Sequence, residues 1–131
     1  MSCLEVIVQK TGADCAVAAL AMLAGRPYRA VSDAARTVAP TAHSRGLYTT
    51  QILAIAESIG FPLKAIARPA SFLKASAADH TGILTVRRKK DDHAVVLFQG
   101  VIVDPMNGMV WDFETFLAQG PWVVNGLLVE R

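Results

Sequence analysis

The run from Cys15 to Ala24 constrains the fold of this chain most, because all of its residues are apolar. It is rich in Ala, Leu and Met, which are strong helix formers, and Gly25 follows it as a C-terminal stop. A helix that is apolar on every side has to be buried on every side. The sequence therefore predicts a central helix over residues Asp14 to Ala24, with the rest of the chain packed around it.

Length and composition narrow the class of protein further. The chain has 131 residues, of which 53% are apolar and 18% charged, so we expect one domain over residues 1–131 with a well-formed core. The apolar run is too short to span a membrane, which needs roughly 20 residues. Asp14 at its edge also argues against a signal peptide. A net charge of +2 is too small to indicate nucleic acid or an anionic membrane as the main partner, and the oligomeric state stays open.

Cysteines and histidines indicate the compartment and the cofactors. The two cysteines, Cys3 and Cys15, are too few for a disulfide framework, so we expect a reducing, cytoplasmic setting. The three histidines, His43, His80 and His93, are far apart and lack the spacing of a zinc motif. The sequence therefore predicts neither a metal ion nor an organic cofactor.

Helical patterns dominate the first half of the chain, and short β-prone runs separated by turns dominate the second. The further helices that we expect are Arg29–Val38, one from a cap at Thr49 or Thr50 to Gly60, one or two turns within Pro69–Ser76, and Asp112–Leu117. The expected strands are Leu4–Val8, Pro62–Ala67, Ile83–Val86, His93–Phe98, Val101–Asp104, Met109–Trp111 and Trp122–Val129. This order predicts an α+β fold, with N-terminal helices packed on a C-terminal antiparallel β-sheet, rather than alternating βαβ units.

Cys15 stands at the start of the central helix and has two interpretations. A free cysteine is often a small, buried hydrophobic residue. At a helix N-terminus, however, backbone amides and the helix dipole stabilise a thiolate, which is the form that acts as a nucleophile. Cys15 alone favours the first interpretation, whereas a nearby base would favour the second.

The segment from His93 to Asp104 supplies a candidate base. If its two strands pair around a tight turn at Gln99–Gly100, Val95 lies opposite Asp104 and shares a face with His93. Asp104 is then diagonal to His93 and within reach of its ring, where a carboxylate can orient an imidazole for a cysteine nucleophile. A slip of one residue would separate the two side chains. The alternative is a solvated histidine and an Asp-Pro pair that only makes a turn.

Gln9 is a candidate for a fourth role. It precedes Cys15 by six residues. Gly12, between them, interrupts regular secondary structure, so a short loop can bring the Gln9 amide to the thiol. Together with a backbone N–H at the helix start, that amide could form an oxyanion hole. The signal is weak when taken alone, because any surface glutamine would look the same.

Taken together, these residues resemble a known family. The segment Gln9–Leu23, with its Gln, its Asp-Cys pair and the Ala, Leu and Met residues that follow, resembles the nucleophile segment of C39-type peptidases. These are papain-like cysteine peptidases. His93–Leu97 resembles the histidine strand of the family, and Val103–Pro105 followed by Gly108 resembles its aspartate turn. The resemblance covers nearly the whole chain and implies a papain-like fold.

The resemblance also implies a role for each candidate residue. It makes Cys15 the nucleophile, His93 the general base and acid, Asp104 the residue that orients His93, and Gln9 the oxyanion-hole donor. The implied activity is that of a thiol hydrolase that cleaves a peptide or isopeptide bond. Ala16 departs from the family pattern, which usually has Gly there, and its methyl group could narrow the approach of a substrate.

The substrate of the best-known relatives does not carry over. Those members are fused to ABC transporters and cut leader peptides after a double glycine, and 131 residues leave no room for a transporter. The chain is more similar to small free-standing C39-like proteins of bacteria and their phages, so we expect a peptide or protein substrate of unknown sequence. Two alternatives stay open, namely a thioester-forming deamidase or transglutaminase, and a catalytically silent peptide-binding module of the same fold.

A short charged run lies between two of the expected strands. Arg87–Lys90 is followed by Asp91 and Asp92. Such a run is typical of a solvated hairpin tip, and the alternative is a surface that docks an acidic partner.

Overall fold

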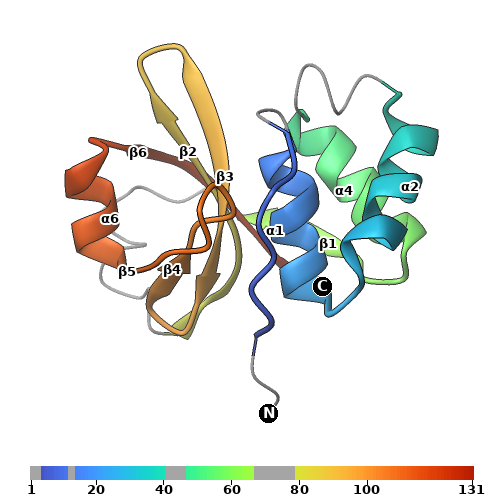
Figure 1. The fold of residues 1–131 in the computed structure, drawn as a ribbon, viewed down its shortest axis with the longest axis horizontal. Coiled ribbons are helices and arrows are strands. Elements are labelled where there is room, and N and C mark those ends of the chain that lie inside the picture. Colours follow the sequence, from blue (N-terminus) through green and yellow to red (C-terminus); the bar gives the residue numbers. More distant parts are fainter. Residues whose placement is uncertain (1–3, 12–13, 41–46, 67–78) are drawn as a thin grey trace.

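The computed structural model describes residues 4–11, 14–40, 47–66 and 79–131 (Figure 1). Its helices are α1 (Cys15–Ala24), α2 (Tyr28–Val38), α4 (Thr49–Ser58) and α6 (Phe113–Gln119). Its strands are β1 (Leu63–Ile66), β2 (Thr81–Arg88), β3 (Asp91–Phe98), β4 (Val101–Val103), β5 (Val110–Asp112) and β6 (Val123–Glu130). Cys3, His43 and the helical turns expected within Pro69–Ser76 lie outside the described residues.

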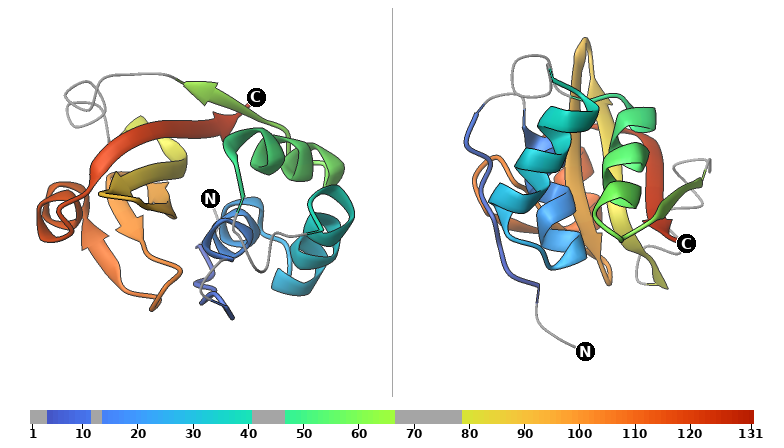
Figure 2. Two further views of the ribbon diagram at one scale, coloured as in Figure 1. Left: turned by 90° about the horizontal axis from the view of Figure 1, so that it is seen from above. Right: turned by 90° about the vertical axis from the view of Figure 1, so that its right-hand side faces the viewer.

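Helix α1 is the buried central helix that the sequence predicts. Its side chains from Ala16 to Met22 are at most 3% exposed. Gly25 ends the helix with a φ of 65°, and its N–H lies against the carbonyls of Ala21 and Met22. The helix packs against β3 on one side and against α2 and α4 on the other (Figure 2), which is why its sequence has no polar stripe.

The sheet has six strands in the order β1-β6-β2-β3-β4-β5, and all neighbouring strands are antiparallel. Strands β2 to β5 form a meander of consecutive hairpins. Strand β6 returns across the sheet and inserts between β1 and β2. The fold is therefore α+β, as expected from the sequence.

Each face of the sheet carries its own hydrophobic core. The core on the α1 side includes Leu20, Ile55 and Val96, and the core on the α6 side includes Val95 and Phe116. Neighbouring residues of β3 thus serve opposite cores, because side chains alternate along a strand. Both faces of β3 are buried, and its sequence is accordingly an almost continuous apolar run.

The segment Leu4–Val8, expected as a strand, belongs to no strand of the sheet. It is extended and lies beside the turn after β4, where a β-carbon on Gly108 would be 3.1 Å from Val8 and 3.3 Å from Val6. Val6 and Val8 remain 45% and 47% exposed. Its β-prone residues therefore form no strand, since the turn that lies beside them offers no ladder of backbone hydrogen bonds.

Several boundaries also differ from the sequence expectation; strand β2, for example, spans Thr81–Arg88 rather than Ile83–Val86. Helix α4 is capped at Tyr48 and not at Thr49 or Thr50, because the Gln51 side chain turns back and accepts a hydrogen bond from the Tyr48 N–H at 2.8 Å. Strand β4 ends at Val103, one residue before Asp104. Because β4 ends at Val103, Asp104 belongs to the turn that follows the strand.

Gly82 marks a close approach of β2 and β6. A β-carbon there would lie 2.1 Å from the Leu128 carbonyl oxygen, whereas one at Gly126 would meet no atom closer than 3.4 Å. We expect Gly82→Ala to lower the free energy of unfolding by about 2 kcal/mol or more, because β2 must move away from β6. The matched control Gly126→Ala should cost less than about 0.5 kcal/mol. Urea denaturation followed by circular dichroism measures both, and equal stabilities would contradict the close approach.

Candidate active site

The β3–β4 hairpin has the register that the sequence predicts, with Val96 opposite Val103. This register brings two polar side chains together at the end of the hairpin. His93 Nε2 donates a hydrogen bond to Asp104 Oδ1 at 2.7 Å. Both residues are 7% exposed, so the hydrogen bond is largely shielded from water and is stronger than it would be in bulk solvent.

The turn after β4 fixes Asp104 independently of His93. The backbone of Asp104 exchanges hydrogen bonds with Met109 and Gly108, at 2.9 and 2.8 Å, and its Oδ1 also accepts from the Met106 N–H at 3.0 Å. Burial alone would raise the pKa of Asp104, but the hydrogen bonds from His93 and Met106 outweigh it and hold this pKa below its ordinary value. Asp104 is therefore a carboxylate at neutral pH.

Asp14 organises the chain immediately before Cys15. It is fully buried, and its carboxylate accepts hydrogen bonds from the Lys10 N–H at 3.0 Å, from the Thr11 N–H at 2.9 Å, and from the Tyr28 hydroxyl. Burial raises the pKa of Asp14, and these hydrogen bonds more than reverse that effect, so the pKa lies below its ordinary value. The Asp14 carboxylate thus holds the backbone of Lys10 and Thr11 next to the start of α1, and this fixes where the helix begins.

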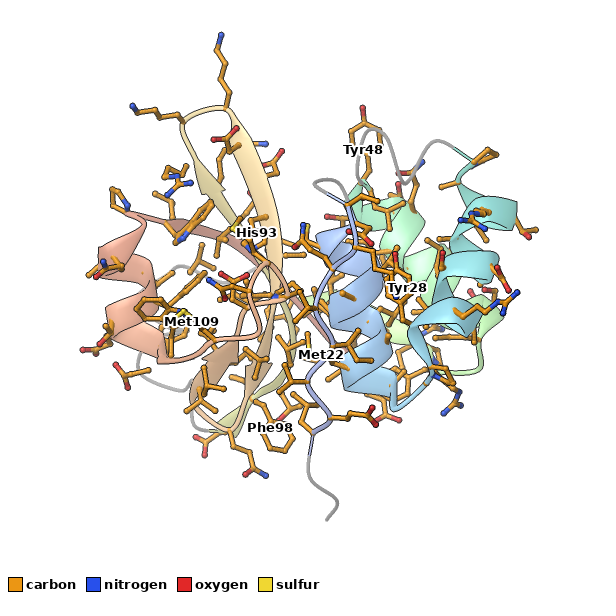
Figure 3. All side chains as sticks on the ribbon, viewed as in Figure 1. Met22, Tyr28, Tyr48, His93, Phe98 and Met109 are labelled. Carbon is orange, nitrogen blue, oxygen red and sulfur yellow. The ribbon has the colours of Figure 1, made fainter. Side chains whose placement is uncertain are left out.

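Tyr28 holds this carboxylate from the side of α2. Burial and the negative charge of Asp14 raise the pKa of Tyr28 to about 12, so its hydroxyl stays protonated and remains a donor. Figure 3 shows Tyr28 and His93 on either side of α1. The start of α1 is therefore anchored on one side, with the catalytic candidates on the other.

Cys15 is partly exposed at the first position of α1 and interacts with His93. Because Asp104 takes Nε2, the ring nitrogen left for Cys15 is Nδ1. Burial alone would lower the pKa of His93. The hydrogen bonds with Asp104 and Cys15, and the negative charges of both groups, outweigh burial and raise the pKa of His93 to about 9. A positively charged imidazole and a helix N-terminus thus both lie beside the Cys15 sulfur.

Gln9 is tied to the same region through its backbone. Its N–H donates to the Pro105 carbonyl at 2.7 Å, which joins the chain before Cys15 to the turn that holds Asp104. Its side-chain amide donates one N–H to the Thr11 carbonyl at 2.8 Å, while Oε1 finds no hydrogen-bond partner in the described part of the chain. The second N–H of the amide is the one left for an oxyanion, and this role stays a prediction.

Trp122 is a neighbour of His93, and Arg88 contacts Trp122; the sequence analysis assigned neither residue to the site. The Trp122 ring stacks on His93, with centroids 5.5 Å apart and an interplanar angle of 27°. The Arg88 guanidinium lies 4.2 Å from the centroid of the Trp122 ring and donates to the Gly120 carbonyl at 2.8 Å. No motif could have revealed this stack, because the residues come together only when β2 pairs with both β3 and β6.

The described ranges contain no group of three or more His, Cys, Asp or Glu side chains that could hold a metal ion. Over the same ranges, no helix is both long and apolar enough to cross a membrane.

Comparison with known families places the chain. The model of the peptidase C39 family matches residues 4–111, which include Gln9, Cys15, His93 and Asp104. The chain belongs to the peptidase C39 family. This is a family of cysteine peptidases, as the resemblance of the three sequence segments implies.

Solved structures of C39 peptidase domains share the fold. The peptidase domain of Streptococcus ComA, described as a bi-functional ABC transporter involved in a quorum sensing pathway, has a TM-score of 0.65 at 16% identity, over 97% of this chain and 96% of that one. The peptidase domain of Streptococcus mutans ComA has a TM-score of 0.65 at 17% identity, over 96% and 98%. Identities this low show a common fold alone. No match was found among curated proteins.

The anchoring of Asp14 can be measured through Tyr28. We expect Tyr28→Phe to lower the free energy of unfolding by about 1–2 kcal/mol, because the buried, charged Asp14 carboxylate loses the hydrogen bond that the Tyr28 hydroxyl donates. Tyr48 is 79% exposed, and its replacement in Tyr48→Phe should change stability by less than about 0.5 kcal/mol. Urea unfolding of both variants gives the comparison. Equal stabilities would mean that the Tyr28–Asp14 hydrogen bond does not hold the start of α1.

The raised pKa of His93 predicts a pH dependence with a definite sign. His93 should titrate near pH 9, whereas a free histidine titrates near ~6.5. Its contribution to stability is therefore complete below about pH 6.5 and is lost as the pH rises through about 9. NMR of the imidazole ring protons measures the pKa, and any activity that needs the imidazolium should fall over the same alkaline range.

Substitution of the carboxylate tests the cause of that shift. Asp104→Asn should move the His93 titration to lower pH, because the negative charge that stabilises the imidazolium is removed. Asp33 is exposed on α2, and Asp33→Asn should leave the titration unchanged. A midpoint below pH 7 in the unsubstituted protein, or one that Asp104→Asn does not move, would contradict the coupling.

Proposed function

We propose that this chain is a single-domain cysteine peptidase that cleaves a peptide or isopeptide bond. Cys15 would be the nucleophile, His93 the general base and acid, and Asp104 the residue that orients His93. The observation that carries the proposal is the buried hydrogen bond between His93 and Asp104 beside a partly exposed cysteine at a helix N-terminus. Membership of the C39 family supports the same assignment.

The first half of the reaction forms an acyl-enzyme. The Cys15 thiolate attacks the carbonyl carbon of the scissile bond, and the electron pair of the C=O bond moves to its oxygen. A backbone N–H at the start of α1 and the second N–H of the Gln9 amide stabilise that oxyanion. Protonated His93 gives its Nδ1 proton to the leaving nitrogen as the C–N bond breaks, and a thioester remains on Cys15.

The second half returns the free enzyme. His93, now neutral, accepts a proton from water as the water oxygen attacks the thioester carbonyl. The C–S bond breaks, the carboxylic acid leaves, and the thiolate–imidazolium pair is restored. Asp104 keeps Nε2 occupied, which presents Nδ1 to the thiol, and its charge stabilises the imidazolium. Ala16 is 3% exposed, so the methyl group that departs from the family pattern packs into the core.

Two other functions use the same residues. A deamidase or transglutaminase would form the same thioester and differ only in the acceptor that resolves it. A silent peptide-binding module would need no nucleophile. The burial of His93 and Asp104 favours a catalytic role over the silent module, since placing two ionisable groups out of water is costly and a binding surface does not require it. The reducing cytoplasm, where a thiol persists, is the compartment that we propose.

Alkylation of the thiols tests the nucleophile. At pH 6, iodoacetamide should modify Cys15 at least about tenfold faster than Cys3, because the alkylation rate follows the thiolate fraction. Peptide mapping identifies the modified residue, and an acyl-trapping probe read by intact mass should give one adduct. That adduct should persist in Cys3→Ala and disappear in Cys15→Ala.

Two results would contradict the proposal. Preferential modification of Cys3 would remove the assigned nucleophile. An alkylation rate at Cys15 that is unchanged in His93→Ala would show that the histidine does not activate the thiol. The fate of the acyl adduct then separates the enzyme classes, since loss of the adduct to water indicates a hydrolase and transfer to an added primary amine indicates a transglutaminase.

A further inference from the structure

An open groove of about 740 Å³ lies beside Trp122 and Arg88, next to the site already described. It is formed by the end of β2, the turn before β6 and the first residues of β6. Its lining includes three basic residues, two apolar residues and one amide, which are Arg87, Arg88, Lys89, Pro121, Val123 and Asn125. Of the described residues that line it, none is acidic.

The groove lies at a segment with a local excess of positive charge. Residues 87–92 contain four of the 13 basic residues and two of the 11 acidic ones, so the rest of the chain has equal numbers of each. Asp92 pairs with Arg87 at 2.8 Å, which compensates that one cation. Lys89 has no ion-pair partner in the part of the chain that the structure describes. Figure 1 shows this tip of the β2–β3 hairpin projecting beyond the rest of the molecule.

Two hydrogen-bond donors of the groove, on Arg88 and Asn125, are held in position before any ligand binds. The Arg88 guanidinium is held by the Trp122 ring and the Gly120 carbonyl, which leaves further N–H groups for a ligand. Asn125 is the extra residue of a β-bulge, because the β2–β6 ladder passes from Gly126 to Val124 without pairing it. A bulge redirects the side chain of its extra residue, and here that residue is part of the groove lining.

We propose that this groove binds an acidic segment of the substrate peptide. A Glu or Asp side chain would lie against Arg88 and Lys89, and an apolar neighbour against Val123. A nucleic acid fits less well, because its phosphate backbone needs a longer track of cations than one hairpin tip in an otherwise neutral chain. That the bound peptide is a substrate rests on the proposed function.

The spacing of the stacked groups sets where the acidic residue lies. His93 and Arg88 both contact the Trp122 ring, at 5.5 Å and 4.2 Å from its centroid, so the imidazole and the guanidinium are no farther apart than these two separations together. An extended peptide covers at most ~3.3–3.6 Å per residue, so about three residues reach from the imidazole to the guanidinium. The acidic side chain would therefore lie within about three positions of the scissile bond.

Binding can be measured without turnover in the full chain carrying Cys15→Ala. The probes are two fluorescein-labelled octapeptides, one of alternating Val and Glu and the other of alternating Val and Gln. In fluorescence anisotropy titrations, the Glu peptide should bind at least about tenfold more tightly, and added NaCl should reduce that difference.

A second substitution tests which cation is responsible. Adding Lys89→Gln to the Cys15→Ala chain should weaken binding of the Glu peptide about tenfold. The matched variant Lys90→Gln changes a cation of the same turn outside the groove lining and should change binding less than about twofold.

Three results would overturn the groove assignment. Equal affinity for the Glu and Gln peptides would remove the acidic selectivity. Equal effects of Lys89→Gln and Lys90→Gln would mean that the acidic peptide is attracted by the overall positive charge of the hairpin tip and not by the groove. Tighter binding of an octathymidylate than of the Glu peptide would indicate a nucleic acid site.

A reactive peptide separates this inference from the proposed function. In the unsubstituted protein, a peptide vinyl sulfone with Glu three residues from the electrophile should modify Cys15 faster than its Gln counterpart. Lys89→Gln should abolish the difference. An unreactive Cys15 together with preserved binding of the Glu peptide would overturn the proposed function and leave the groove standing. Equal modification of Cys15 by both peptides, without selective binding, would overturn the groove assignment and leave the proposed function standing.

Discussion

The complete burial of α1 is the constraint on which the rest of the structure depends. An apolar helix of this length is stable only when neighbours cover every face, and here β3, α2 and α4 do so. With its sides covered, the helix can present reactive groups only at an end. The N-terminal end carries Cys15, which is partly exposed and interacts with His93 of the sheet. The packing that stabilises the fold thus also determines where the thiol lies.

Buried charges around this helix end are each matched by specific hydrogen bonds. Asp14 is satisfied by two backbone N–H groups and the Tyr28 hydroxyl, and Asp104 by His93 and the Met106 N–H. Because both carboxylates keep a pKa below the ordinary value despite burial, hydrogen bonding outweighs desolvation at each. Asp14 secures the backbone that leads to the thiol, and Asp104 secures the imidazole. Two separate carboxylates thus position the two groups that we propose act together, Cys15 and His93.

The insertion of β6 between β1 and β2 links this site to a second surface. It brings the Trp122 ring into contact with both the His93 ring and the Arg88 guanidinium. The Arg88 side of the stack continues into the basic groove. Trp122 contacts both the imidazole and Arg88, a residue of the groove lining, so a ligand in the groove would lie within a few residues of the bond that we propose is cleaved.

Local signals in the sequence determined a large part of this structure. The apolar run and Gly25 predicted α1 and its end, and the turn at Gln99–Gly100 with alternating β3 residues predicted the register that brings Asp104 to His93. Both depend on interactions between residues near in sequence, which patterns report directly. The same patterns failed for Leu4–Val8, because β-prone residues form a strand only where a partner strand is within reach.

Only the tertiary structure decided which distant segments meet. Asp14 with Tyr28, Trp122 with His93, and Arg88 with Trp122 are contacts between elements whose adjacency depends on helix packing and on the position of β6 in the sheet. No residue type at any spacing encodes that adjacency, since it follows from how several apolar faces are buried at once. The sequence by itself therefore determined the chemical groups of the site and their local order. Long-range packing decided how deeply those groups are buried and which side chains surround them, and with that the pKa of His93.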